Sequence, residues 1–157
     1  MDERTSVLYV DDNPKSSRLL SALLEECGFR VINRDDPIEA LALCRRASFD
    51  LALLDYEMPT MNGAQLAREI KGLAPEVPVV LISGRTSIPA TDLQFVDAHF
   101  GFGTDMDDLL WSMRVLAPPR VVGKVPVPSR NSGCRRGDIR PNREQASINE
   151  ARWADST

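Results

Sequence analysis

The stretch LALLDYEMPTMNG occupies residues 51–63 and carries most of the information about the fold of this chain. Its first four residues are apolar, as in a strand that is buried on both faces, and they run directly into Asp55. A second apolar run, at residues 7–10, ends in the same way at Asp11 and Asp12. Two short strands that both end in acid predict one acidic pocket at one edge of a parallel sheet. Such a pocket would repel itself unless it held a divalent cation.

The rest of the body alternates strand-like and helix-like patterns. We expect strands at residues 6–10, 30–33, 50–54, 77–82 and 97–102. Helical stripes of apolar residues follow the first, second, third and fifth of these strands, and the pairs Asn13-Pro14 and Asp36-Pro37 predict where the first two helices begin. Residues 87–95 are a short region that holds Pro89, so a weak helix is expected there. Five such repeats imply a doubly wound parallel α/β sheet, in which ligands bind beyond the carboxyl ends of the strands.

The charge is distributed unevenly along the 157 residues, although the net charge is only −4. Residues 1–116 hold 11 basic and 19 acidic residues, a net charge of −8, whereas residues 117–157 hold 8 basic and 4 acidic residues, a net charge of +4. The second segment also carries five prolines, few apolar residues and no sustained period. We therefore expect one globular domain over residues 5–116 and a basic, disordered C-terminal tail over residues 117–157.

Several classes of protein are disfavoured by what the sequence lacks. No apolar run approaches the roughly 18 residues that a membrane-spanning helix needs, and the N-terminus shows no signal-peptide core. The three cysteines are far apart and show neither metal-ligand spacing nor a disulfide framework. We therefore expect a cytoplasmic protein that does not associate with membranes.

Over residues 5–116 the chain resembles the receiver domain of two-component response regulators. The resemblance is carried by the two acids after the first strand, by Asp55 after the third, and by the pattern D-x-x-M-P-x-M-N-G over residues 55–63. Ser83 and Gly84, after the fourth strand, match the family's hydroxyl position. The resemblance implies a flavodoxin-like, doubly wound, five-stranded parallel sheet in the order 2-1-3-4-5, with helices on both faces.

The resemblance also implies a reaction and a role for each site residue. Asp55 would accept a phosphoryl group from a histidine kinase or a histidine phosphotransfer protein, in a Mg²⁺-dependent reaction. Asp12 and Asp55 would bind Mg²⁺ directly, together with the backbone carbonyl of Glu57, while Asp11 would act largely through a water molecule. Ser83 would be the switch hydroxyl that bonds the phosphoryl oxygen after transfer.

Simpler interpretations of these residues stay open. The acidic pair after the first strand could cap the following helix, and Ser83 could be an ordinary turn serine. Glu57 and Arg85 fall two residues beyond Asp55 and Ser83, at places that in the family tune hydrolysis of the phosphoryl group, but ordinary exposed charge is an equal alternative. Gly63 is expected to permit a tight turn near the site.

The chain departs from the family pattern in the fifth strand. The family usually ends this strand with a lysine that pairs with the phosphoryl oxygens, whereas no lysine lies between Lys71 and Lys124 here. Phe102 falls at the lysine position, and a phenylalanine can neither pair with an oxyanion nor donate a hydrogen bond. His99 falls at the family's aromatic switch position, and we interpret it as a partly buried ring rather than as a switch.

These observations predict a stand-alone receiver that signals by contact with a downstream protein effector. It would phosphorylate itself and slowly dephosphorylate itself, and it would not be an enzyme in the usual sense. The alternative is a receiver-like binding module that is not phosphorylated, because Phe102 replaces the site lysine. A nucleic-acid partner is not expected, since the tail arginines lack a fold and interleaved aromatic residues, and only weak, salt-sensitive contact would follow from them.

Overall fold

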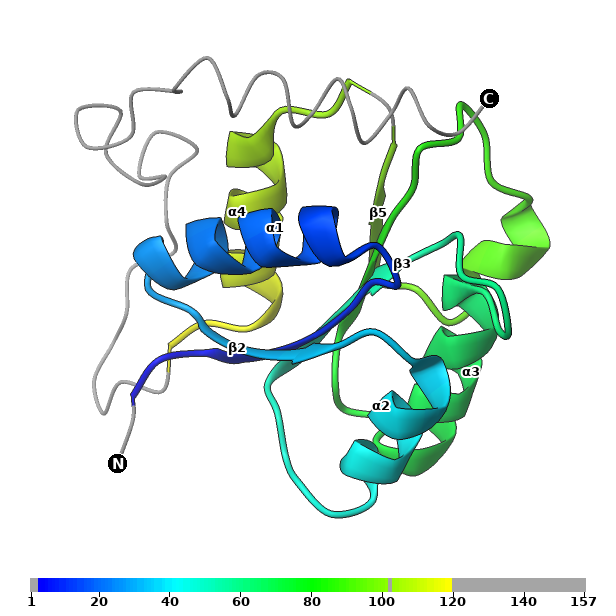
Figure 1. The fold of residues 1–157 in the computed structure, drawn as a ribbon, viewed down its shortest axis with the longest axis horizontal. Coiled ribbons are helices and arrows are strands. Elements are labelled where there is room, and N and C mark those ends of the chain that lie inside the picture. The colour runs from blue at the N-terminus through cyan, green and yellow to red at the C-terminus, as the bar shows by residue number, and fades with distance from the viewer. Residues whose placement is uncertain (1–2, 102, 120–157) are drawn as a thin grey trace.

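The computed structural model describes residues 3–101 and 103–119, and it contains a parallel sheet at its centre (Figure 1). The strands are β1 (Ser6–Val10), β2 (Arg30–Arg34), β3 (Leu51–Asp55), β4 (Val79–Ile82) and β5 (Ala98–Phe100). They pair in the order β2-β1-β3-β4-β5, and every pair is parallel. The predicted doubly wound sheet and its strand order are therefore confirmed.

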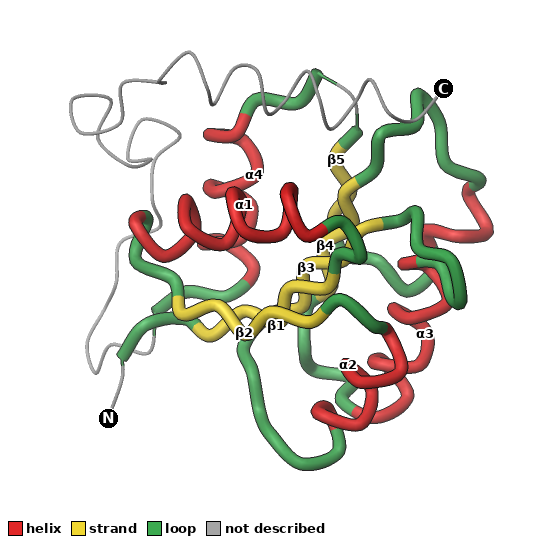
Figure 2. The backbone as a smooth tube through the Cα atoms, in the orientation of Figure 1, coloured by secondary structure: helices red, strands yellow, loops and turns green. Residues whose placement is uncertain are grey.

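Helices cover both faces of this sheet, as Figure 2 shows. The helices are α1 (Pro14–Glu26), α2 (Pro37–Cys44), α3 (Gly63–Leu73) and α4 (Met106–Leu116). α1 and α4 lie on one face, and α2 and α3 lie on the other (Figure 1). None of the helices in the described ranges is both long and apolar enough to cross a membrane.

The first two helices begin where the sequence signals predicted. Asn13 caps α1 by accepting hydrogen bonds from two backbone N–H groups of the first turn, and Asp36 caps α2 in the same way from one. A proline occupies the first helical turn in both cases. α3 begins with a capping box, in which Asn62 and Gln65 each accept a hydrogen bond from the other's backbone N–H. These caps fix the loops that leave the carboxyl ends of β1, β2 and β3.

The central strands supply a core on each side of the sheet. Successive side chains of a strand point to opposite faces, so β1 contributes Val7 and Tyr9 to the α1 and α4 side and Leu8 and Val10 to the α2 and α3 side. All four of these side chains are fully buried. The continuous apolar runs in the sequence follow from this arrangement, because a strand covered on both faces has no solvent-facing position.

The connection between β4 and β5 differs most from a regular helix-strand repeat. Only the short 3₁₀ helix η1 (Ala90–Leu93) forms within the weak region, and it has no side-chain cap. β5 is an edge strand of three residues, beginning after Asp97, whose carboxylate accepts a hydrogen bond from the Val79 backbone N–H at 2.7 Å. His99 is exposed, so its interpretation as a partly buried ring is wrong. The reason is that β5 lies at the edge and η1 is too short to cover it.

Candidate functional site

Three acidic side chains meet where β1 and β3 end. β1 and β3 are neighbours in the sheet, with Val10 paired to Leu54, so Asp11 and Asp55 leave the same edge side by side. One carboxylate oxygen from each of Asp11, Asp12 and Asp55 lies within 4.8 Å of the other two. We call these three residues the acidic trio. The structure thus brings together the carboxylates that the sequence predicted to meet at one edge of the sheet.

The members of the acidic trio differ sharply in exposure. Asp11 is 1% exposed, Asp55 is half-buried and Asp12 is exposed. Both oxygens of Asp11 accept hydrogen bonds, Oδ2 from the Tyr9 hydroxyl at 2.5 Å and Oδ1 from the Asn13 backbone N–H at 3.0 Å. Asp11 is therefore held at the back of the site, while the other two carboxylates are reachable from outside.

Gly63 is required by close packing rather than by a turn. A Cβ atom at this position would lie 2.4 Å from the backbone oxygen of Asp55 and 2.6 Å from Cδ1 of Leu81. The backbone angle φ of Gly63 is not in the left-handed region, so the predicted tight turn is not what demands glycine here. The start of α3 instead presses directly on the last residue of β3, which fixes the backbone of Asp55.

Ser83 lies at the end of the neighbouring strand β4 and is fully buried. Its backbone N–H donates to the Phe100 carbonyl at 3.0 Å, and its hydroxyl oxygen accepts from the Arg85 backbone N–H at 2.9 Å. The Arg85 side chain reaches toward the loop after Asp55, with its Nε 3.5 Å from a Glu57 carboxylate oxygen. Both of these charged side chains are roughly half exposed, so this ion pair contributes little to stability.

Two tyrosine hydroxyls near the site were missed by the sequence reasoning. The Tyr9 hydroxyl binds the acidic trio, and the Tyr56 hydroxyl donates to Asp92 Oδ2 of η1 at 2.6 Å. The hydrogen bond to the Asp92 carboxylate, with burial adding to it, raises the pKa of Tyr56. The signal was present for Tyr9, because it lies two residues before Asp11 and such pairs share one face of a strand.

The ligand chemistry of the acidic trio fits a hard divalent cation. Its donor atoms are all carboxylate oxygens, which Mg²⁺ and Ca²⁺ prefer, and it contains none of the nitrogen or sulfur donors that favour zinc. Within residues 3–101 and 103–119, this is the one group of such side chains close enough to hold a metal ion. Asp12 and Asp55 are the accessible members, and Glu57 follows Asp55 by two residues.

The predicted absence of a site lysine is not addressed by the described residues. Phe102, which the sequence comparison put at the lysine position, lies outside them. Lys71 is bound elsewhere, with its Nζ 2.8 Å from Asp97 Oδ2 and 2.8 Å from the Val77 carbonyl oxygen, near the amino ends of β4 and β5. Lys71 therefore cannot serve the acidic trio, which lies at the carboxyl ends.

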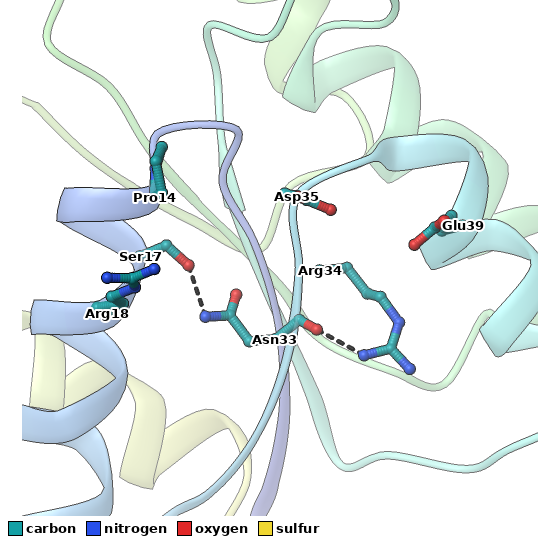
Figure 3. Close-up of a pocket in the computed structure, with 7 residues that line it drawn as sticks. All are labelled: Pro14, Ser17, Arg18, Asn33, Arg34, Asp35 and Glu39. Atoms are coloured by element: carbon teal, nitrogen blue, oxygen red, sulfur yellow. Dashed lines mark hydrogen bonds between the residues drawn. The ribbon is translucent and has the colours of Figure 1, made fainter.

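A separate hollow of about 390 Å³ opens beside the site, between the start of α1 and the connection from β2 to α2 (Figure 3). Its lining residues are Pro14, Ser17, Arg18, Asn33, Arg34, Asp35 and Glu39. The Asn33 amide donates to the Ser17 hydroxyl at 2.5 Å, and the Arg34 guanidinium donates to the Asn33 carbonyl at 2.6 Å. None of the acidic trio lines this hollow, so the hollow and the trio are distinct features of the surface.

Comparison with known proteins agrees with this geometry. The family described as response regulator receiver domain matches residues 7–99. The transcriptional regulatory protein ZraR of Klebsiella oxytoca is 35% identical over 86 residues, which are 55% of this chain and 19% of that protein. The chain thus spans about a fifth of the length of this relative.

Solved structures of receiver domains share the fold. The response regulator protein TrrA from Thermotoga maritima, solved in complex with Mg²⁺ and BeF, has a TM-score of 0.67 at 26% identity, over 71% of this chain and 98% of that one. A structure of histidine kinase ThkA in complex with TrrA gives a TM-score of 0.66 at 26% identity, over 71% of this chain and 97% of that one. With the sheet order, the acidic trio and the match over residues 7–99 in agreement, the chain belongs to the response regulator receiver domain family of two-component signalling systems.

Proposed function

We propose that this chain accepts a phosphoryl group on Asp55 from a histidine kinase or a histidine phosphotransfer protein, in a Mg²⁺-dependent reaction. It then signals through contact with a downstream protein effector. The observation that carries the proposal is the meeting of three carboxylates within 4.8 Å at the ends of β1 and β3. The structures of TrrA with Mg²⁺ and BeF and with histidine kinase ThkA support this choice of metal and of partner.

Asp55 is the best-placed nucleophile of the acidic trio. Asp11 is buried and both of its oxygens accept hydrogen bonds, so a phosphodonor cannot reach it. Asp12 is reachable, but it lies in the loop after β1, so its backbone is not held by a strand. Asp55 is half-buried, ends β3, and has its backbone locked against Gly63. A fixed carboxylate that remains accessible from outside is what an in-line displacement needs.

The transfer itself needs little covalent chemistry from the protein. A carboxylate oxygen of Asp55 attacks the phosphorus of the phosphohistidine, the P–N bond breaks as the new P–O bond forms, and the electron pair remains on the imidazole nitrogen. Negative charge spreads over the three phosphoryl oxygens, and bound Mg²⁺ supplies positive charge that offsets it. Asp12, Asp55 and the Glu57 backbone carbonyl would hold the ion, with Asp11 acting through a water molecule.

Ser83 is proposed to bind the phosphoryl group once it is in place. Its backbone N–H is tied to β5 and its oxygen accepts the Arg85 N–H, so its hydroxyl hydrogen remains to be donated. Ile82 pairs with Asp55 across β3 and β4, which puts Ser83 one residue past the acceptor on the neighbouring strand. Formation of this bond would draw the β4–β5 connection toward the acceptor.

The phosphoacceptor is tested by chemical phosphorylation. Incubation with acetyl phosphate and Mg²⁺ should add one phosphoryl group, stable in acid and labile in base, and Asp55→Asn should abolish it. Asp35→Asn is the matched control, because Asp35 is an exposed acid outside the trio. Intact-mass spectrometry measures the product. A label that persists in Asp55→Asn, on Ser83 or Asp12, would show that the acceptor has been assigned wrongly.

The metal site is tested separately by calorimetric titration with Mg²⁺. Asp12→Asn should weaken binding, because a hard cation loses one of its two accessible anionic ligands. Asp35→Asn should leave the dissociation constant unchanged. Equal Mg²⁺ affinities of the wild type and Asp12→Asn would rule out the proposed metal site.

A receiver-like binding module that is not phosphorylated remains the second candidate. The observation that favours it is the absence of any lysine between Lys71 and Lys124. The two functions are separated by the acetyl phosphate experiment, since a binding module would bind Mg²⁺ or a protein partner and yet remain unlabelled.

A further inference from the structure

We propose that Tyr9 is a positioning residue of the metal site. Its hydroxyl holds Asp11 in one orientation, in which Asp11 would act on a bound Mg²⁺ through a water and would not be a direct ligand. The inference rests on the proposed Mg²⁺ site and adds a residue to it from the core of the protein, where no metal-site residue was expected.

The contact that carries the inference is short and buried. Tyr9 is fully buried in β1, Asp11 is 1% exposed, and the Tyr9 hydroxyl donates to Asp11 Oδ2 at 2.5 Å. The Asp11 backbone N–H donates to the Arg34 carbonyl at 3.1 Å, so the ladder between β1 and β2 continues through Asp11. Tyr9 and Asp11 therefore follow the same strand path, two residues apart, with their side chains on one side.

Asp11 is fixed at both of its oxygens. Oδ1 accepts from the Asn13 backbone N–H, and the Asn13 side chain in turn caps α1. Rotation of the carboxylate would break one hydrogen bond to the core and one to the start of the helix. A carboxylate oxygen can accept more than one hydrogen bond, so an oxygen held in this way could also accept one from a water.

Packing in the core explains the aromatic ring of Tyr9 but not its hydroxyl group. The Tyr9 ring belongs to the core cluster between the sheet and α1 with α4, whose other strand members are Val7, Leu51, Leu53, Val80 and Ile82. A phenylalanine would present the same ring to these apolar neighbours. The hydroxyl reaches past the core to the acidic trio, where it directs the positive end of its dipole at a carboxylate crowded by two others.

The chain offers an internal control for this contact. It contains two tyrosines, and Tyr56 is also buried, at 6% exposure, with its hydroxyl bonded to a carboxylate. That carboxylate is Asp92 of η1, which is not part of the acidic trio. Tyr56→Phe therefore removes the same chemical group from a comparable environment without touching Asp11.

The test is calorimetric titration of the full chain with Mg²⁺. Tyr9→Phe should weaken binding about tenfold, the lower end of the effect of outer-shell partners on metal affinity. Tyr56→Phe should bind as the wild type does. In an Asp11→Asn background, Tyr9→Phe should cause no further loss, because Tyr9 acts through Asp11.

A second measurement needs no folded variant of Tyr9. Ring-labelled tyrosine gives two resonances in the wild-type protein, and the spectrum of Tyr56→Phe assigns them. The Tyr9 resonance should shift on addition of Mg²⁺, and this shift should be lost in Asp11→Asn. Unchanged Mg²⁺ affinity in Tyr9→Phe, or an equal loss with and without Asp11, would overturn the inference and leave the metal site intact. A wild type that binds no Mg²⁺, or Asp12→Asn with undiminished affinity, would overturn the metal site and the inference together.

Discussion

Arg85 is the one lysine or arginine in the sequence between Lys71 and Arg114. Its guanidinium lies 5.9 Å from the centre of the Tyr56 ring and near the Glu57 carboxylate, so it stands beside the two residues that follow Asp55. A phosphoryl group on Asp55 would carry more negative charge than Glu57, and a guanidinium binds phosphate through several donors at once. If Asp55 is phosphorylated as proposed, we expect the Arg85 guanidinium to bind the phosphoryl group and to supply part of the positive charge for which the family pattern has a lysine.

Removal of this charge should slow phosphorylation. A charge-assisted hydrogen bond is worth about 1.5–3 kcal/mol, so Arg85→Gln should lower the rate of labelling by acetyl phosphate roughly ten- to a hundredfold. Arg68→Gln, on the exposed face of α3, is the control and should label at the wild-type rate. Time courses by intact mass give both rates. An unchanged rate in Arg85→Gln would mean that its guanidinium only pairs with Glu57.

Restoration of a lysine should act in the opposite direction. Phe102→Lys places a cation where the family has one, and it should speed labelling, most clearly in the Arg85→Gln background. Phe102 lies outside the described residues, so this prediction rests on the sequence comparison alone. A double variant that labels no faster than Arg85→Gln would show that Phe102 does not occupy the lysine position.

Single residues at the site were predictable to different degrees. Asp11, Asp12 and Asp55 could be found because each follows an apolar run, and parallel strands bring their carboxyl ends together. The Tyr9 contact was missed because Tyr9 looks like one more apolar residue of its strand, although its place two residues before Asp11 was a usable signal. The exposure of His99 depends on how much of β5 its neighbours cover, which is a property of the packed structure.

Among the secondary-structure elements, α3 packs closely on β3 through Gly63. Gly63→Ala would force a methyl group against the Asp55 backbone and the Leu81 side chain, so we expect a loss of about 1–3 kcal/mol in the free energy of unfolding. Gly72→Ala, near the other end of the same helix, meets no atom within 4 Å and should stabilise the protein by about 0.5–1 kcal/mol. Urea unfolding followed by circular dichroism measures both variants. Equal stabilities would contradict the close packing of α3 on β3.

Elements with strong local signals were predicted well, and those without them were not. Residues 7–10 of β1 and 51–54 of β3 are apolar because both faces of these strands are covered, and the first two helix starts carry cap residues and prolines. β5 is shorter than predicted, since an edge strand with one partner is bounded by tertiary contacts such as the bond from Val79 to Asp97. Pro89 correctly predicted a weak helix, and η1 is what forms.

At the scale of the whole molecule, Ala117 connects the end of the last helix to the beginning of the first strand. The Thr5 hydroxyl donates to the Ala117 carbonyl at 3.1 Å, and Ala117 is 6% exposed within the core cluster of α1 and α4. Arg114 also donates to the Cys27 carbonyl, which puts a cation at the C-terminal end of α1, where that helix has no basic residue of its own. These contacts join the first strand, the first helix and the last helix.

Two truncations test where the folded unit ends. Removal of residues 120–157 should leave the thermal midpoint nearly unchanged, because the composition of this segment offers little apolar surface to bury. Removal of residues 117–157 should cost about 1 kcal/mol more, since Thr5 loses its buried acceptor. Calorimetric melting compares the two proteins. A loss of several degrees on the shorter deletion would mean that the basic segment packs on the domain.

The hydrogen bond between Tyr56 and Asp92 has a consequence for hydrogen exchange. η1 has no buried residue and no cap, so the β4–β5 connection should open locally at a lower free energy than the central strands. The bond from the Tyr56 hydroxyl to Asp92 opposes this opening, and Tyr56 directly follows Asp55, the proposed phosphoacceptor. We therefore expect amide protection along residues 84–97 to change when Asp55 is phosphorylated, because Tyr56 links this segment to the residue beside it.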